Sequence, residues 1–480
     1  MGTNSPIVAN GMTLHGAPGS DWIVRPIPPL SERQRGWIEA AERHVDEASL
    51  ADLISQIVGT PSPTGNEHEL ATILVDVLAD AGVESTLQPL DAMQANALGV
   101  LPGEGTGPKL LMYAPIDTHT TGDPAKDLPW VGEALRDDMV PVATPVGSSI
   151  VGLGAGNPKG HAACVVAAAR ALARAGIPFT GDVVVGLGAG GMPVTAPADD
   201  PLGRSTIGHG RGCDYMVSKL EGLDSAIIAK PGSPSWEEVG LAIIRIDVPG
   251  EMDYAGSRHR GTHENPILNA APIIDSLEKW CREYTHRHTA GTVAPQGSIG
   301  ALRAGWPEKP TFTPARCEIY LDLRIAPGGK VSGILAEFES GMQTIRENAR
   351  NAAVDWEVLA AIPGGRTRPA SWIVQSCVRA WETIEGSRYE PPTGKSGATD
   401  AAILRGHRIP TVRVGMPPPS AVERSADFSS GMNTVELDAA VRLTRTLIRC
   451  AVDTCTRTRD EIAQGGGNCG ASIDATMDPE

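Results

Sequence analysis

One stretch of the chain, residues 110–192, restricts the possible folds more than any other. Two runs in it, Leu110 to Tyr113 and Val183 to Val185, are consecutive β-prone residues without polar alternation. Such runs are typical of strands buried on both faces of a parallel or mixed sheet. Between them, residues 161–175 form a predicted helix with alanine at most positions that would contact a neighbour. A helix of small residues packs closely on a sheet, so the stretch predicts an α/β fold.

Polar side chains gather in the loops of this stretch. Asp117 and His119 follow the first strand, while Asn157, Lys159 and His161 lie where the helix begins. Because ligands of α/β sheets bind at the carboxyl ends of the strands, we expect these residues and the loop after the second strand to face one crevice. The alternative is a set of ordinary capped loops without a function.

Composition narrows the class of protein. The chain has 480 residues, 41% of them apolar, which is enough for a large core and makes two domains the expectation. Its formal net charge is −16, and no run of five or more basic residues occurs. Nucleic acid and anionic membranes are therefore poor partners, and a small-molecule substrate is expected instead.

Location follows from two further observations. No apolar run approaches the roughly 18 residues that span a bilayer, and the first residues lack the basic start and apolar core of a secretory signal. We therefore expect a cytoplasmic protein. The eight cysteines are dispersed without a CxxC pair, which favours reduced core thiols.

The order of predicted elements divides the chain into segments. Two amphipathic helices are expected between Ser31 and Ala81, with Asn66 capping the second. From Val239 the order changes to strand, helix, strand, strand, helix, strand, which is typical of an inserted two-layer domain. The predicted segments are an arm at 1–30, a first domain split between 31–236 and 362–457, an inserted domain at 237–361, and a disordered tail at 458–480.

Several motifs resemble those of one enzyme family. They are SPTGNE at 62–67, IDTH at 116–119, GLGAGNPKG at 152–160 and SGATDAA at 396–402, and they occur in the family's order. The chain resembles the zinc-dependent amidohydrolases and peptidases that include aminoacylases, succinyl-diaminopimelate desuccinylases and glutamate carboxypeptidases. The resemblance implies a split catalytic-type α/β domain with a central mixed sheet, an inserted α+β two-layer lid that carries a dimer contact, and a homodimer.

The metal ligands that the resemblance implies are nearly all replaced. The family holds two zinc ions with a histidine, a bridging aspartate, a glutamate pair, a further acid and a late histidine. These positions fall, in that order, on Pro115, Asn157, Gly190 with Gly191, Lys230, and a segment whose one candidate is Asp427. Asp117, which orients the first histidine in the family, is retained. We therefore expect the zinc site to be lost and no cofactor to be bound.

The first functional hypothesis is a metal-independent hydrolase of a small amide, imide or related C–N substrate. Lys230, Lys159 or both would stabilise a developing oxyanion in place of zinc. Asp117 would orient His119 as the base, with His161 as a second candidate.

Candidate substrate-binding residues are fewer and each has an ordinary structural alternative. Asn265 is also suited to capping a helix, Arg324 to a surface ion pair with Asp322, and Asp400 to a helix N-cap. Tyr254 lies near the position of a lid histidine that the resemblance implies. The candidate substrate-binding residues are Asn157, Tyr254, Asn265, Arg324 and Asp400.

Two alternatives to this hypothesis stay open. A catalytically inactive family member would bind a ligand or partner through the retained crevice. A metal-dependent hydrolase would use a displaced site, with its ligands drawn from His119, His161, Asp117, Asp199, Asp200 and His209. The sequence does not fix the substrate.

Overall fold

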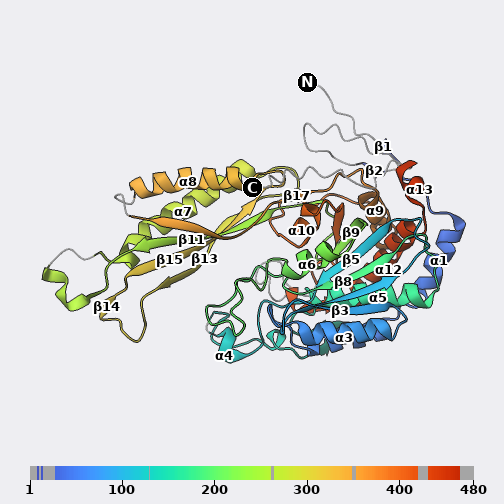
Figure 1. Cartoon of the computed structure of the whole chain (residues 1–480), viewed down its shortest axis with the longest axis horizontal. Coiled ribbons are helices and arrows are strands. Elements are labelled where there is room, and N and C mark those ends of the chain that lie inside the picture. Colours follow the sequence, from blue (N-terminus) through green and yellow to red (C-terminus); the bar gives the residue numbers. More distant parts are fainter. Residues whose placement is uncertain are drawn as a thin grey trace, which may run out of the picture. The chain divides into compact units, whose positions relative to one another are not determined.

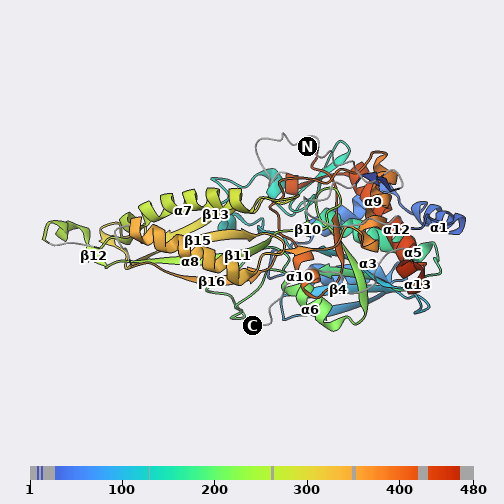
Figure 2. The same cartoon turned by 90° about the horizontal axis from the view of Figure 1, so that it is seen from above.

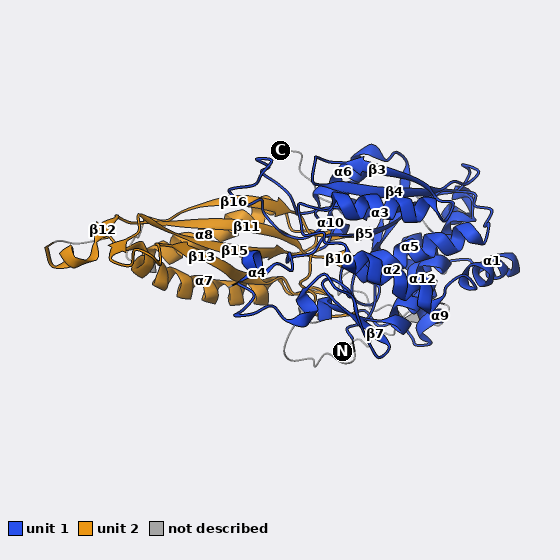
Figure 3. Ribbon diagram, turned by 90° about the horizontal axis from the view of Figure 1, so that it is seen from below, with its two compact units in different colours: residues 1–236, 367–391, 399–473 blue, residues 237–366, 392–398, 474–480 orange. Residues whose placement is uncertain are grey.

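A computed structural model describes residues 8–9, 12–13, 27–128, 130–260, 264–348, 353–419 and 431–464. The chain forms two compact units, which Figure 3 colours separately. Unit 1 contains the described residues of 1–236, 367–391 and 399–473, and unit 2 those of 237–366 and 392–398.

Unit 1 is built on a six-stranded sheet in the order β18-β9-β5-β8-β4-β3. Figure 1 labels β9, β5, β8 and β3 of this sheet, and Figure 2 labels β4. The first four strands in this order are parallel, whereas β4 and β3 are antiparallel additions at one edge. The sheet is therefore mixed, as predicted. The strands are β3 (Glu84–Pro89), β4 (Ala95–Leu101), β5 (Lys109–Pro115), β8 (Val183–Gly188), β9 (Leu223–Ala229) and β18 (Thr411–Val414).

Helices cover both faces of this sheet. The larger core joins the strands to α2, α3, α5, α9 and α12, and a second core on the other face joins them to α6 and α10. The helices of unit 1 are α1 (Glu32–Glu42), α2 (Glu47–Gly59), α3 (His68–Ala79), α4 (Pro124–Asp127), α5 (Lys159–Arg174), α6 (Arg211–Lys219), α9 (Trp372–Glu385), α10 (Ala401–Gly406), α12 (Leu437–Cys455) and α13 (Arg459–Gln464), with the 3-10 turn η1 (Asp137–Met139). Its short strands are β1 (Val8–Ala9), β2 (Met12–Thr13), β6 (Thr144–Val146), β7 (Ser149–Val151) and β19 (Thr434–Glu436).

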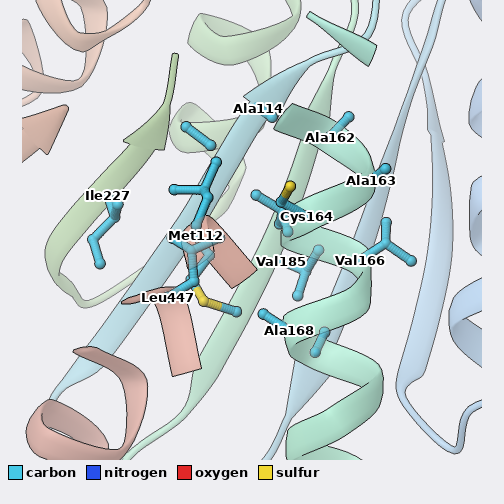
Figure 4. Close-up of a cluster of buried hydrophobic side chains, with 14 of the residues drawn as sticks. Met112, Ala114, Ala162, Ala163, Cys164, Val166, Ala168, Val185, Ile227 and Leu447 are labelled. Atoms are coloured by element: carbon cyan, nitrogen blue, oxygen red, sulfur yellow. The ribbon is translucent and has the colours of Figure 1, made fainter. Parts of the chain in front are cut away.

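The small residues of α5 allow this helix to lie close to the central strands. Ala162, Ala163 and Ala168 have no exposed surface, and Figure 4 shows α5 beside the strands that carry Met112 and Val185. Each fully buried apolar side chain of Met112's size contributes about 1.5–3 kcal/mol relative to an exposed one. The sheet's centre is thereby fixed, along with the loops that leave it.

Unit 2 is an antiparallel sheet, in the order β13-β15-β11-β16, with two long helices on one face. In β15, Ile319, Leu321 and Leu323 are fully buried in the core with these helices, whereas Asp322 and Arg324 stay partly exposed. The elements are β10 (Glu237–Glu238), β11 (Gly240–Pro249), β12 (Asp253–Tyr254), η2 (Ala255–Arg260), α7 (Pro266–His288), β13 (Gly297–Ala304), β14 (Phe312–Thr313), β15 (Arg316–Ile325), α8 (Val331–Asn348), β16 (Asp355–Ile362) and β17 (Gly365–Arg366).

Three details differ from the predicted segments. Three helices, not two, lie between Ser31 and Ala81, because the Asp46 side chain accepts a hydrogen bond from Ser49 N (2.7 Å) and starts α2. Residues 392–398 belong to unit 2, where Lys395 pairs with Val293. The expected disordered tail is wrong for α13, whose Ile462 is buried.

Two further findings concern membrane-spanning helices and cysteines. Within the described residues, no helix has both the length and the apolar character needed to cross a bilayer. The described cysteines are buried free thiols, and Cys469 lies outside the described residues.

Candidate active site

The candidate site lies in unit 1, at the carboxyl ends of the three central parallel strands. Strand β5 leads into Asp117 and His119, β8 leads into the Gly190–Met192 turn, and β9 leads directly into Lys230. Because β5 pairs with both β8 and β9 in parallel, these three segments leave the same edge of the sheet. The polar residues of these three segments therefore leave one edge of the sheet.

Asp117 is a fully buried anchor of the neighbouring loops. Its Oδ1 accepts from Gly191 N (2.9 Å), and its Oδ2 accepts from Met192 N (2.9 Å) and Thr64 Oγ1 (2.8 Å). Three donors aimed at one carboxyl group match an ionised carboxylate, which only accepts hydrogen bonds. Asp117 therefore holds the loops at 64 and 190–192 together.

Gly190 and Gly191, at the positions that the resemblance assigns to a glutamate pair, are fixed by packing. Gly190 has a φ of +63°, and a Cβ there would lie 2.4 Å from Ile207 O. A Cβ on Gly191 would lie 2.4 Å from the Cβ of Pro115. A side chain at either position would clash with its neighbours. The close contact with Pro115 therefore requires glycine at position 191.

His119 is exposed and has no hydrogen-bond partner among the described residues. Its pKa is lowered, mainly because surrounding protein displaces water; the charge of Asp117 raises the pKa and that of Lys230 lowers it. The ring is thus neutral at pH 7 and able to accept a proton. Asp117 acts on His119 through its charge. The predicted orienting hydrogen bond is absent from the described contacts of Asp117, which are to Thr64, Gly191 and Met192.

Lys230 is 5% exposed and directly follows β9. Its backbone N–H donates to Val414 O (3.1 Å), which fixes the residue against β18. Its ammonium lowers the pKa of both His119 and His161. The positive charge is therefore near the exposed imidazole.

Lys159 does not have the predicted role. Its side chain is fully buried, and Nζ donates to Thr60 O (2.7 Å) at the end of α2. Burial lowers its pKa to about 7. Lys159 is a buried cap of α2 and not a crevice cation, which corrects the prediction.

His161 is likewise unavailable as a base. Its Nδ1 bonds to Gly156 O (2.7 Å), and its Nε2 accepts from Met416 N (3.2 Å). Burial, first among the causes, lowers its pKa to about 3. Both ring nitrogens are used by the backbone, so His161 is a neutral structural bridge.

Two predicted substrate-binding residues lie in unit 1. Asn157 is 8% exposed, and its buried Oδ1 has no hydrogen-bond partner among the described residues. Asp400 stands at the N-cap position of α10, as the structural alternative predicts, but its side chain makes no cap hydrogen bond and instead accepts the Tyr113 hydroxyl (2.5 Å). Burial, helped by the charge of Asp400, raises the pKa of Tyr113 well above its usual value.

The other three predicted substrate-binding residues lie in unit 2. Asn265 caps α7 by accepting from Ile267 N (3.0 Å), and Arg324 pairs with Asp322 (2.6 Å). Tyr254 is 55% exposed and packs on Phe312. For Asn265 and Arg324, the ordinary structural alternatives account for the contacts.

Glu67 is a residue that the sequence reasoning missed. It has no exposed surface, and its Oε1 accepts from Gly65 N (3.0 Å) and Gly190 N (2.9 Å). Glu67, not Asn66, precedes the first residue of α3. The available signal was its place at the end of SPTGNE, directly before a helix.

The residues at the positions that the resemblance assigns to zinc ligands do not fit two metal ions. Proline and glycine side chains have no donor atom, and Lys230 brings a positive charge where a cation would bind. Asp427 lies outside the described residues. For the part of the chain that is described, no group of three or more His, Cys, Asp or Glu is arranged to hold a metal.

No protein-family model matches the sequence. Solved structures do match it: human carnosine dipeptidase 1 superposes with a TM-score of 0.65 at 14% identity, over 92% of this chain and 100% of that one. YXEP of Bacillus subtilis, described as a dinuclear metal binding peptidase from the M20 family, gives 0.53 at 15% over 86% and 99%. A hydantoinase/carbamoylase family amidase from Burkholderia ambifaria gives 0.53 at 15% over 87% and 99%. The chain therefore has the fold of the M20 peptidases and related amidohydrolases, which confirms the predicted fold class and the resemblance at the level of the fold.

Proposed function

We propose that this chain is a hydrolase of a C–N bond in a small amide, imide or related substrate, and that it works without the zinc pair. One observation carries the proposal: the nearly buried Lys230 is close enough to lower the pKa of the exposed, neutral His119. A cation and a proton acceptor at one edge of the sheet are the two groups that amide hydrolysis needs. The peptidase and amidase neighbours support the same reaction class.

The proposed reaction assigns roles to His119, Lys230 and Asp117. His119 takes a proton from water as the oxygen attacks the carbonyl carbon, and the resulting oxyanion lies against the Lys230 ammonium. The tetrahedral intermediate collapses as His119 returns the proton to the leaving nitrogen, which yields a carboxylic acid and an amine. Asp117 keeps the adjacent loop in place and adds a negative charge that favours protonated His119.

One observation favours the alternative of binding without turnover. The described contacts of Asp117 are to loop donors, and a carboxylate–histidine hydrogen bond to His119 is not among them. An experiment on the full chain separates the two functions.

The test is a panel of dipeptides, N-acyl amino acids, N-carbamoyl amino acids and cyclic imides, followed by mass spectrometry of the released amine. We expect turnover of at least one class, and His119→Gln to lower kcat by at least roughly 100-fold, the low end for general-base loss. His44→Gln, at an exposed position on another loop, is the matched control. Binding without consumption across the panel would support the alternative, and an active His119→Gln protein would remove the assigned base.

A further inference from the structure

The turn after β8 presents three successive backbone N–H groups to two acidic side chains. Gly190 N donates to Glu67 Oε1 (2.9 Å), and Gly191 N and Met192 N donate to the two oxygens of Asp117 (both 2.9 Å). A run of adjacent N–H groups forms a site for negative charge. Here the chain's own carboxyl groups occupy it.

The two acids are close together but differ in their bonding. Asp117 receives donors on both oxygens, whereas Glu67 receives two on Oε1 and none on its buried Oε2. An ionised oxygen without a partner is costly inside a protein, because it loses its water without compensation. Protonation of Glu67 at Oε2 removes that charge.

The charges around Glu67 also favour its protonated form. Burial of Glu67 and, second, the negative charge of Asp117 on the facing loop raise the pKa of Glu67 to about 8. Hydrogen bonds from Gly65 N, Gly190 N and the Gln94 side chain lower the pKa by less. The neighbouring arginines are engaged elsewhere: Arg204 pairs with Asp200 (2.7 Å) and Arg211 with Asp91 (2.6 Å). Within the described residues, Glu67 has no ion-pair partner.

We propose that Glu67 is held as a neutral carboxylic acid and that, with the carboxylate of Asp117, it locks the Gly190–Met192 turn and positions Asp117 near His119. Glu67 is thus a positioning residue that ties the loop at 65 to the loop at 190 through one oxygen atom. Its ionisation would place two negative charges side by side in a buried cluster and weaken the lock. The proposal concerns stability and stands whether or not the chain is a hydrolase.

The direction of the pH effect follows from linkage. The folded pKa of Glu67 lies above its value in an unfolded chain, so the folded state binds the extra proton between about pH 4.5 and 8. Stability from this group is therefore full below that window and falls as the pH rises through it. A neutral residue at position 67 removes this dependence.

The experiment compares thermal unfolding of the full chain with Glu67→Gln and Asp117→Asn at about pH 5.5 and about pH 9. Glutamine keeps the acceptor for both glycine N–H groups, so the Tm of Glu67→Gln matches the parent at the lower pH and exceeds it by a few degrees at the higher pH. Asparagine turns its N–H₂ toward a backbone donor, so Asp117→Asn lowers the Tm by roughly 3–6 °C at both pH values. Infrared difference spectra show a protonated carboxyl band that Glu67→Gln lacks.

Three results would overturn the proposal: a Glu67→Gln protein that fails to fold, one that is destabilised at the lower pH as much as Asp117→Asn, or a parent without the carboxyl band. Each can occur with or without turnover of an amide. Failure here is thus distinct from failure of the proposed function.

Discussion

Lys230→Met lowers kcat by at least roughly 100-fold, while the protein stays folded. The expected fall in kcat has this size because the variant loses the group proposed to stabilise the oxyanion, and removal of one such donor lowers kcat by about 10²–10³. Methionine has an unbranched apolar chain like that of Lys230, which is 5% exposed, so the packing around this position is retained. Steady-state kinetics and circular dichroism measure the two parts of the prediction.

A second readout separates loss of charge from general damage. Lys230 lowers the pKa of His119, so its removal raises that pKa and moves the acid limb of kcat/KM to higher pH. Any residual activity of Lys230→Met shows this shift. Lys219→Met, at an exposed position on α6, is the control and leaves the profile unchanged. A fully active Lys230→Met enzyme would remove Lys230 from the mechanism.

Gly191→Glu, which places an acid where the resemblance implies one, destabilises the protein by at least about 3 kcal/mol. The new Cβ would lie 2.4 Å from the Cβ of Pro115, closer than carbon atoms approach without displacement. It would also lie 3.0 Å from Asp400 Oδ2 and 3.2 Å from Asp117 Oδ1, so the added carboxylate enters an acidic, buried environment. Denaturant unfolding measures the loss.

The control for this variant is Gly36→Ala in α1. Nothing lies within 4 Å of its Cβ position, so alanine stabilises the protein by about 0.4–1 kcal/mol through the unfolded state. A Gly191→Glu protein as stable as the parent would contradict the account of this site. Recovery of stability in the Pro115→Gly and Gly191→Glu double variant would show that the two positions are coupled.

The sequence predicted the frame of unit 1 better than the direction of its side chains. Strands β5 and β8 and helix α5 follow from runs of β-prone or small residues, because burial on both faces leaves a local pattern. The gathering of Asp117, His119 and Lys230 follows from strand order, a general property of α/β sheets. These predictions rest on patterns among residues that are adjacent in the sequence and on the order of the strands.

The unpredicted parts depend on contacts between distant residues. Lys159 reaches the carbonyl of Thr60, 99 positions earlier, and no local pattern distinguishes that cap from a crevice cation. His161 bonds to Met416 N from another segment of the fold. Glu67 was overlooked because Asn66 is the better capping residue by type, while the partner of Glu67, Gly190 N, lies 123 residues further on.

The most direct test of metal-independent hydrolysis is elemental analysis of the chain purified without chelator, paired with turnover before and after dialysis against chelator. The account predicts near-zero zinc, manganese, nickel and iron per chain and unchanged turnover. One or two equivalents of bound metal, with turnover lost on chelation and regained when the metal is returned, would contradict it.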